Sequence, residues 1–450
     1  MVSDWKTQKL DELIVKRNQG VNTTTEKVKY SESGKPVIRA NSISQSRIDF
    51  SDCVFVDDVT FQRIKEPCKP KKGDVLYTNI GSQFGSAAKV ESDFEFTIAW
   101  NVLRLQVSKD LDADFLVYLL NNPKNKALIQ SLNSSSTMPF VSGTVIGNIE
   151  FLYPDYETQK RIVAKLKPLD AKIDLSRGIN QTLEKMAQVL FKSWFVDFDP
   201  VIDNALAAGN AIPDELQERA KLRKIVIAQR ATNPKLKPLP DNIQQLFPSE
   251  FKESELGWIP KGWQIKTIDT LNKINPESWT NKTAPESVKY VDLANAKYGA
   301  VLDTTEFTFS EAPSRARRVL KIHDTIIGVV RPANRSFAYI NEEGLTGSTG
   351  FAVVRAKKES YRAFTYFSLT NDDCIREFAR IADGAAYPAI KPDDVAKALC
   401  VYSSEQILSQ FENLAGQFLL KKSKNEQQLQ PLKTIRDTLL PKLISGEVII

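Results

Sequence analysis

The chain contains an internal repeat, and a repeat restricts the possible architectures more than any single motif does. Residues 71–90, KKGDVLYTNIGSQFGSAAKV, match residues 320–340, LKIHDTIIGVVRPANRSFAYI, with Asp74 corresponding to Asp324 at an offset of about 250. Each segment has the pattern of a strand, a polar loop and a second strand. The sequence therefore predicts two divergent copies of one mixed α/β domain.

The order of the remaining segments supports the same duplication. The copies begin alike, with Trp5 in the first and Trp263 in the second, and Met138 later stands against Tyr387. The polar loops diverge most, NIGSQFGS against VVRPANRS, and loops on a fixed scaffold commonly carry recognition. The two copies therefore need not bind the same ligand. The other matching segments are 97–107 with 347–357, 114–130 with 362–379, and 137–154 with 386–403.

A long helical segment follows each copy, at about residues 157–195 and 406–444. Apolar residues recur there in steps of three and four, which is the pattern of a coiled-coil seam, and polar Ser176, Asn180 and Lys422 interrupt it. Each helix leaves a different domain, so we expect the two to pack antiparallel as a spacer of roughly 58 Å, at 1.5 Å per residue. The seam residues are Ile162, Leu166, Leu169, Ile173, Leu183, Ala187, Leu190 and Trp194 in the first helix and Phe411, Ala415, Phe418, Leu429, Leu432, Ile435, Leu439 and Leu443 in the second.

The alternative is that each helix folds onto its own domain as an ordinary core helix. Pro168 and Pro431 lie inside the segments, and an interior proline kinks or ends a helix. The predicted class is α+β, with two tandem-repeat mixed α/β domains separated by two long helices in an antiparallel coiled coil. The expected boundaries are 1–155 for the first domain, 156–198 for its helix, 199–255 for a linker, 256–404 for the second domain and 405–450 for the last helix.

We expect a short helix in the linker, beginning near Pro213. Its later residues include Lys221, Arg223, Lys224 and Arg230, where cations suit the helix dipole. This basic helix could contact phosphate, although a solvated face is the commoner reading.

Composition excludes several function classes. The 61 Lys and Arg against 55 Asp and Glu give a net charge of +6, which permits an anionic partner without requiring one. The four cysteines have no C-x-x-C spacing and there is one histidine, so a disulfide framework or a zinc site is disfavoured. Neither a phosphate-binding G-x-x-x-x-G-K-[ST] loop nor a G-x-G-x-x-G motif is present. With no apolar run near the roughly 20 residues of a membrane span and no signal-peptide core, we expect a cytoplasmic protein.

Two candidate catalytic features have simpler structural interpretations. His323 lies in VLKIHDTIIGVV, which reads as the rim of a strand or a turn, so a structural role is favoured over acid–base catalysis. Asp393 and Asp394 follow Pro392 and precede Lys397, a string that a metal-dependent nuclease could use. Proline and acidic residues are also typical of the first turn of a helix, and we favour that interpretation.

Four stretches of the sequence are similar to a known family. They are LFKSWFVDFDPV at 190–201, IPDELQERA at 212–220, FPSEFKESELGWIPKGW at 247–263 and IRDTLLPKLISGEV at 435–448. In this order, and with the duplicated layout, they resemble conserved stretches of type I restriction-modification specificity subunits along essentially the whole chain.

The resemblance implies a non-catalytic subunit with two target recognition domains, each reading one half of an asymmetric, split DNA sequence. It also implies two modification subunits as partners, which use S-adenosylmethionine to methylate adenines, and ATP- and Mg-dependent restriction subunits that translocate and cut DNA. This chain would bind none of these cofactors itself. The absence of a [DNS]-P-P-[YFW] loop agrees, because an amino-methylase would carry one and Asp199-Pro200-Val201 does not match it.

Candidate DNA-binding residues follow from the repeat and from side-chain chemistry. Arg, Lys, Asn and Gln are the usual readers of base edges, and phosphate contacts add affinity. For Arg315, Arg317 and Arg318 a solvated loop is an equal alternative, and for Tyr387 core packing is one. The candidates are Lys35, Arg39, Asn41, Ser42, Lys71, Lys72, Thr78, Asn79, Ser82, Gln83 and the stretch from Thr137 to Phe140 in the first domain, and Arg315, Arg317, Arg318, Arg331, Asn334, Arg335 and Tyr387 in the second.

The resemblance also implies that modification subunits dock near the spacer. Trp194, Phe195 and Phe198 at the end of the first helix suit a partner interface, since Trp and Phe are enriched in interface cores. They could instead pack the two helices together, as we expect for Leu190.

Two other functions remain as alternatives to the specificity subunit. A free-standing DNA-binding regulator would bind one site tightly alone, and a nuclease would cleave DNA in a metal-dependent manner alone.

Overall fold

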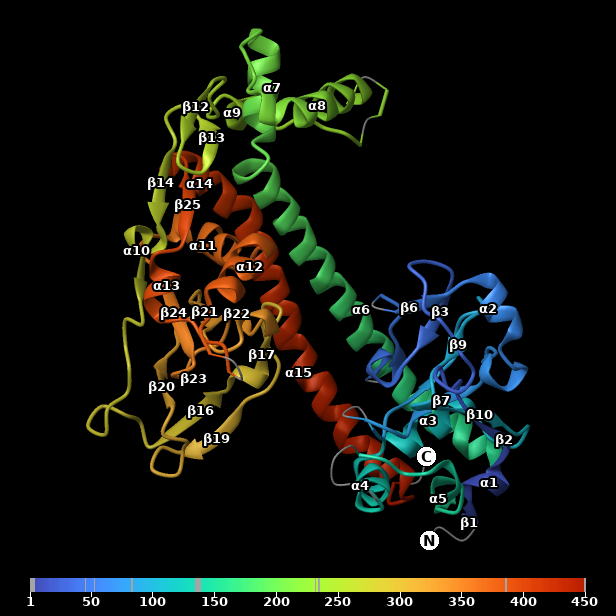
Figure 1. Ribbon diagram of the computed structural model, residues 1–450. Coiled ribbons are helices and arrows are strands. Elements are labelled where there is room, and N and C mark those ends of the chain that lie inside the picture. The colour runs from blue at the N-terminus through green and yellow to red at the C-terminus, as the bar shows by residue number, and fades with distance from the viewer. Residues whose placement is uncertain are drawn as a thin grey trace. The chain divides into compact units, whose positions relative to one another are not determined.

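The computed structural model describes residues 5–448, apart from residues 45, 52, 82–83, 134–138, 231, 234 and 385–386. The chain forms two compact units, one made of the chain up to Leu175 together with the part from Gln428 onward, and one made of residues 176–427. Each unit contains one mixed α/β domain and part of both long helices (Figure 1). The expected α+β class with two tandem domains and two long helices is confirmed.

A four-stranded antiparallel sheet lies at the centre of the first unit. Its strands run in the order β2 (Ile14–Gln19), β10 (Val102–Val107), β7 (Val75–Thr78) and β8 (Ala87–Lys89). Helices α3 (Ala113–Asn121) and α4 (Pro123–Ser131) share its apolar core. Among the other strands, β1 (Lys6–Lys9) pairs with β11 (Glu150–Tyr153), β3 (Lys35–Ile38) lies between β6 (Val54–Val56) and β9 (Thr97–Ile98), and β4 (Ile43–Ser44) pairs with β5 (Arg47–Ile48). The short helices are α1 (Leu10–Leu13), α2 (Asp58–Arg63), α5 (Gly143–Gly147), η1 (Ala40–Ser42) and η2 (Glu66–Cys68).

The second unit repeats this sheet in the same strand order. Its strands are β15 (Asn272–Ile274), β24 (Phe351–Ala356), β21 (Thr325–Gly328) and β22 (Phe337–Tyr339), and α11 (Arg362–Thr370) and α12 (Asp372–Ile381) follow as α3 and α4 do. A second sheet has the strand order β19 (Thr305–Thr308), β16 (Ser287–Val291), β23 (Leu345–Ser348) and β20 (Ala316–Val319). Three strand pairs are β14 (Gln264–Thr267) with β25 (Leu399–Tyr402), β17 (Ala296–Lys297) with β18 (Ala300–Val301), and β12 (Phe251–Ser254) with β13 (Gly257–Pro260). The remaining short helices are α10 (Ile268–Leu271), α13 (Pro392–Ala396), η4 (Leu293–Asn295), η5 (Pro332–Asn334) and η6 (Glu359–Tyr361).

A buried aspartate–arginine pair explains why Asp74 and Asp324 match in the repeat. Asp74 accepts a hydrogen bond from Nε of Arg104 at 2.7 Å, and Asp324 accepts two from Arg355 at 2.8 Å each. The same carboxylates accept the backbone N–H three residues earlier and so close the turn before the strand. An apolar residue in place of Asp74 would leave Nε of the buried Arg104 and the N–H of Lys71 without this acceptor.

The first long helix, α6 (Tyr156–Phe195), continues through Pro168. The second expected helix is divided, because a π-helix (Glu412–Gly416) separates α14 (Glu405–Phe411) from α15 (Gln417–Ile444). The side chain of Glu412 folds over Gly416, where an added Cβ would lie 2.6 Å from Oε1. Its other oxygen accepts the N–H of Ala363 at 2.7 Å. Glu412 thus links the π-helix to the start of α11, a contact that the apolar periodicity of the sequence does not indicate.

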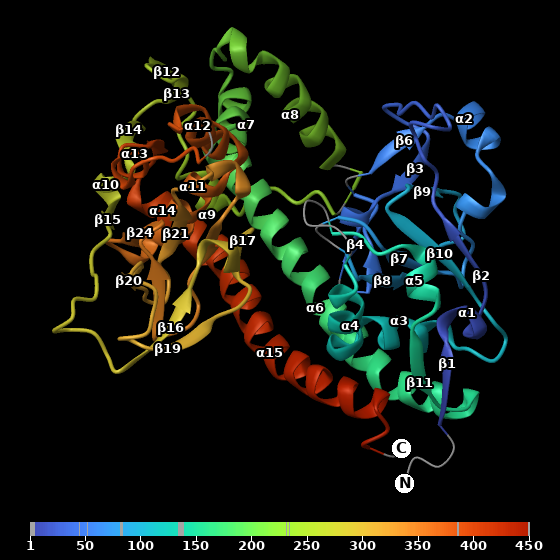
Figure 2. The ribbon, with the colours of Figure 1, turned by 60° about the horizontal axis from the view of Figure 1, so that its bottom comes forward.

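The two long helices run antiparallel. In the second unit Lys422 donates to Glu184 at 3.0 Å, and Asn425 donates to Asn180 at 2.9 Å. In the first unit Arg436 donates to Asp170 at 3.1 Å. Residues with higher numbers on α6 pair with residues with lower numbers on α15, as antiparallel helices require. Figure 2 shows the two helices side by side. Asn180 and Lys422, two of the polar residues that interrupt the predicted seam, therefore form hydrogen bonds between the helices.

The linker forms a charged helical hairpin. Helix α7 (Asp199–Ala208) presents Asp199 and Asp203 to α8 (Gln217–Arg230), where Arg219 and Arg223 form bidentate pairs with them. Arg223 and Arg230 of the predicted basic helix both pair with Asp203 within the chain, so the expected solvated face does not hold for these two residues. The short helix η3 (Asp214–Leu216) precedes α8, and α9 (Asp241–Gln244) follows it.

No helix within the described ranges is both long and apolar enough to cross a membrane.

Candidate nucleic-acid interface

Two loops of the second unit are joined at the end of its central sheet. The loop after β21 carries Arg331, and the loop before α13 carries Tyr387. The N–H of Arg331 donates to the carbonyl of Pro388 at 2.6 Å, and Ile390 donates to the carbonyl of Val329 at 2.9 Å. These backbone bonds fix one loop against the other and hold their side chains together.

Arginine side chains cluster on this junction. The guanidinium of Arg331 lies 4.5 Å from the ring centroid of Tyr387, whose side chain is 70% exposed. Arg335 forms an ion pair with Asp372 on α12 at 2.5 Å, and Asn334 lies exposed between the two arginines. Core packing is therefore excluded for Tyr387, since its ring is a surface platform for a cation.

The three arginines at β20 have separate partners. Arg315 donates to the hydroxyl of Tyr290 and to Asp292, and the bond to Tyr290 raises the pKa of the guanidinium. Arg317 stacks over Phe309 at 4.6 Å. Arg318 donates to Ser278 at 3.1 Å, and partial burial lowers its pKa. The fully solvated alternative does not hold for Arg318.

The same loop junction exists in the first unit. Gly81 donates to the carbonyl of Pro139 at 2.9 Å, Val141 donates to the carbonyl of Asn79 at 3.1 Å, and Phe140 forms an isolated bridge with Ile80. Each bond has its counterpart in the second unit. The matched loops confirm that the repeat extends to the loop geometry and not only to the sheet.

Three candidates of the first unit, Ser42, Thr78 and Asn79, are buried and are therefore wrong as exposed readers of DNA. Thr78 and Asn79 are completely buried, because they lie where β7 enters the junction rather than on its surface. Thr78 accepts the N–H of Ser86 at 2.8 Å, and Asn79 bonds to Gln19 and to the carbonyl of Val141. Their side chains hold the loop in place.

The other candidates of the first unit are dispersed. Lys35 pairs with Glu95, and this hydrogen bond raises the pKa of the lysine; Lys72 pairs with Asp93 with the same effect. Asn41 and Lys71 are exposed, Arg39 is half-buried and Ser42 is buried. Ser82, Gln83, Thr137 and Met138 lie outside the described residues, whereas Phe140 is half-buried and its N–H donates to Asn133.

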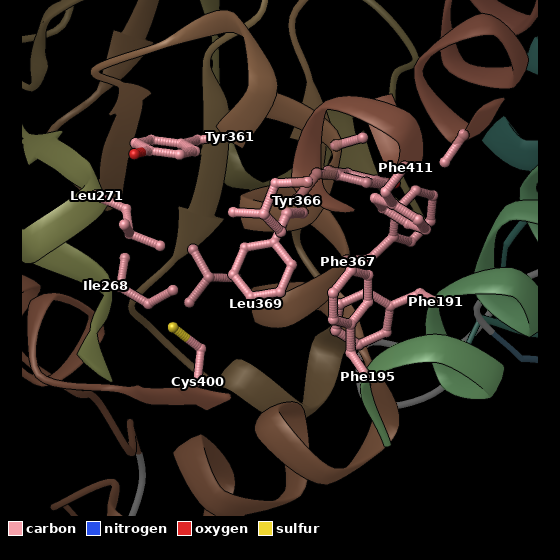
Figure 3. Packing of buried hydrophobic residues seen from close by; sticks show 14 of the residues in the cluster. Phe191, Phe195, Ile268, Leu271, Tyr361, Tyr366, Phe367, Leu369, Cys400 and Phe411 are labelled. Carbon is pink, nitrogen blue, oxygen red and sulfur yellow. The ribbon is translucent and has the colours of Figure 1, made fainter. Parts of the chain in front are cut away.

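The expected exposure of Trp194, Phe195 and Phe198 is also wrong. Trp194 is 1% exposed and packs on Phe247 with a centroid distance of 5.0 Å, and Phe195 packs on Phe364 at 4.9 Å. Figure 3 shows Phe195 and Phe191 of α6 facing Phe367 and Phe411. Phe198 contacts Trp263 at 5.9 Å, so these rings form the core of the second unit and present no surface to a partner.

A different part of α6 carries an exposed apolar stripe that the seam analysis missed. Ile179, Met186 and Val189 follow one another at seven and three residues and are 39%, 49% and 68% exposed. These residues have the same spacing as the seam but lie on another face of the helix. A search for a single apolar stripe therefore could not separate them from the seam residues. The sequence signal that could have shown this surface is a second set of apolar residues at helical spacing on the same long helix.

The simpler interpretations hold for the two candidate catalytic features. His323 lies in a turn with Nδ1 3.0 Å from the hydroxyl of Tyr339, and burial lowers its pKa. Pro392 begins α13, and Asp394 accepts the N–H of Lys391 at 2.6 Å. Within the described ranges, no group of three or more His, Cys, Asp or Glu side chains could hold a metal ion.

Comparison with known proteins gives one consistent family. Residues 2–185 match the model of the type I restriction modification DNA specificity domain. The specificity subunit of the type I restriction enzyme HindI, from Haemophilus influenzae, is 25% identical over 84% of this chain and 87% of its own length. Over most of its length the chain is thus similar to type I restriction specificity subunits.

Further relatives carry the same description. The MjaIX specificity subunit of Methanocaldococcus jannaschii is 23% identical over 75% of this chain and 69% of its own. The solved S subunit of a type I restriction-modification system from M. genitalium is 15% identical, with a TM-score of 0.52 over 98% of this chain and 96% of that one. That likeness concerns the fold of type I specificity subunits and leaves the DNA sequence open.

Proposed function

We propose that this chain is the DNA-recognition subunit of a type I restriction-modification complex. Each α/β domain would read one half of an asymmetric bipartite DNA target, and the two long helices would separate the two readers. The observation that carries the proposal is the repeated loop junction, in which the backbone bonds are kept while the side chains differ. A duplicated scaffold with diverged loops suits the reading of two different half-sites.

The catalytic steps belong to partners in this proposal. Two modification subunits would supply S-adenosylmethionine chemistry, restriction subunits would supply ATP- and Mg-dependent translocation and cutting, and this chain would bind no cofactor. DNA as the target would place the complex in the cytoplasm.

The exposed apolar stripe on α6 is the surface we assign to the modification subunit. Ile179, Met186 and Val189 lie on a helix whose opposite side is already packed into the core. Apolar side chains at heptad positions suit a partner helix. We expect Met186→Glu with Val189→Glu to prevent co-purification of the modification subunit without lowering the stability of the free chain. Gln181→Glu is the matched control, because it adds the same charge at an exposed position of the same helix.

Co-expression with a neighbouring modification subunit tests the function directly. We expect size-exclusion chromatography with mass determination to give two modification subunits for each copy of this chain, and methylation mapping to find adenines in one split motif. A chain that stays alone and binds one DNA site tightly would instead be a free-standing regulator. Metal-dependent cleavage by the chain alone would indicate a nuclease.

A further inference from the structure

A glycine position of the first unit is occupied by an arginine in the second. Gly81 and Arg331 both donate their backbone N–H to a proline carbonyl, that of Pro139 and Pro388 respectively. Both have positive φ, +100° for Gly81 and +50° for Arg331. Glycine adopts this region without a steric penalty, whereas any L side chain is disfavoured there. Glycine therefore suits the backbone conformation at this position better than arginine does.

The side chain of Arg331 has a defined position. Its guanidinium stacks over the exposed ring of Tyr387, 4.5 Å from the centroid. Stacking on an aromatic face orients the plane of the guanidinium, which a lysine ammonium cannot reproduce. A planar, oriented fork on an exposed surface is the geometry that bonds O6 and N7 of guanine in the major groove.

Arg335 provides a contrast within the same loop. It also has positive φ, +53°, but its guanidinium is paired with Asp372. Its charge is thus directed to α12, and a role in shaping the loop explains it. The two arginines are the N-cap and C-cap residues of η5, and Arg331 stacks on Tyr387 whereas Arg335 pairs with Asp372.

We infer that Arg331 reads a guanine in the half-site of the second domain, with Tyr387 as the platform that positions its guanidinium. This inference rests on the proposed function, because it names a specificity-determining residue of that same DNA-binding surface. The bipartite motif should then contain a G·C pair in one half whose recognition depends on Arg331 and not on Arg335.

The test measures the methylation rate of the complex with its modification subunit on duplexes that differ at single base pairs. For Arg331→Gly we expect discrimination at one G·C pair to fall by roughly 5- to 150-fold, with the other half-site unchanged. Arg331→Lys should also lower the discrimination at this G·C pair, because lysine lacks the planar fork of the guanidinium. Tyr387→Ala should reduce the same discrimination, and Tyr387→Phe should retain it since the ring remains.

Arg335→Gly is the matched control, because it removes the same charge and the same unfavourable backbone position. The thermal midpoint of both glycine variants should equal or exceed that of the original chain, which excludes misfolding as the cause. An Arg331→Gly complex that keeps its discrimination overturns the inference. So does an equal loss of rate on all sequences, which is the behaviour of a phosphate contact, or the same relaxation in Arg335→Gly. Failure of the original complex to methylate any split motif would instead reject the proposed function.

Discussion

The buried cluster around Lys422 makes the sharpest stability prediction. Lys422 lies in the second unit and its side chain is 8% exposed, and its ammonium donates to Glu184 and to the carbonyl of Gly299, both at 3.0 Å. The second oxygen of Glu184 accepts the hydroxyl of Tyr366 at 2.9 Å. Lys422→Met keeps most of the chain length of the side chain but leaves a buried carboxylate and a buried carbonyl without this donor.

The magnitude follows from the cost of an uncompensated charge. Removing one partner of a buried ion pair costs about 3 to 5 kcal/mol, whereas replacing both partners with apolar residues is often close to neutral. We expect Lys422→Met to lower the free energy of unfolding by about 3 to 4 kcal/mol. The double variant with Glu184→Leu should be more stable than the single variant, although Tyr366 then loses its acceptor.

Urea unfolding followed by tryptophan fluorescence is a suitable assay. Trp194, Trp258, Trp263 and Trp279 all lie in the second unit, so most of the signal reports on the unit that contains the substitution. Lys221→Met is the control, since Lys221 forms an exposed pair with Glu218 and such pairs contribute roughly 0 to 1 kcal/mol. A loss below about 1 kcal/mol for Lys422→Met, or a double variant less stable than the single one, would refute the reasoning.

Two further predictions concern the repeated framework and the one histidine. Arg104→Met and Arg355→Met should each cost about 3 to 5 kcal/mol, because each leaves a buried carboxylate, that of Asp74 or of Asp324, without its cation; urea unfolding of both measures the cost, and a loss below about 1 kcal/mol for both would contradict the reasoning. Burial, and then the charge of Arg362, lower the pKa of His323, so the fold favours the neutral ring. The corresponding stability is present above the ordinary histidine pKa of about 6.5 and is lost as pH falls through the lowered pKa. Proton NMR should find this single ring titrating below pH 6.5, and His323→Asn should remove this pH dependence; a midpoint at or above 6.5 would exclude the buried neutral state.

The apolar framework of both domains could be predicted from the sequence because it is repeated. The match of Asp74 with Asp324 indicated two strands and the polar loop between them in each copy, and the repeat also matched the loops that carry Arg331 and Tyr387. Burial at the junction could not be predicted. Asn79 is in a polar loop in the sequence, but its partners Gln19 and Val141 come from segments about 60 residues away. A polar side chain satisfied by distant segments looks like a surface residue until the fold is known.

The aromatic residues at the end of α6 show the opposite error. Trp194 and Phe195 follow the seam period, yet their partners Phe247, Phe364 and Phe411 come from the linker, from α11 and from α14. Aromatic side chains are enriched in interfaces and in cores alike, so composition could not decide between the two. The exposed stripe of Met186 and Val189 was recognisable only after the buried side of the helix was known.

The polar layers between the long helices explain how one register is selected. Asp170 and Glu184 are fourteen residues apart on α6, and their partners Arg436 and Lys422 are fourteen apart on α15. Each carboxylate also accepts a tyrosine hydroxyl from the domain of its own unit, Tyr118 at 2.5 Å and Tyr366 at 2.9 Å. Burial, and then the bond to Asp170, raise the pKa of Tyr118, so that hydroxyl remains a donor.

A slip of one heptad would disrupt both layers together. Asp170 would then face Leu429 or Leu443, and Glu184 would face Leu429 or Ala415, so two carboxylates would lose their cations against apolar side chains. An apolar seam alone tolerates such a slip, because one heptad of leucines resembles the next, whereas a buried polar layer fixes the register. The acid–base layers therefore specify the pairing of the helices, and the tyrosines tie each domain to the layer that lies in its own unit.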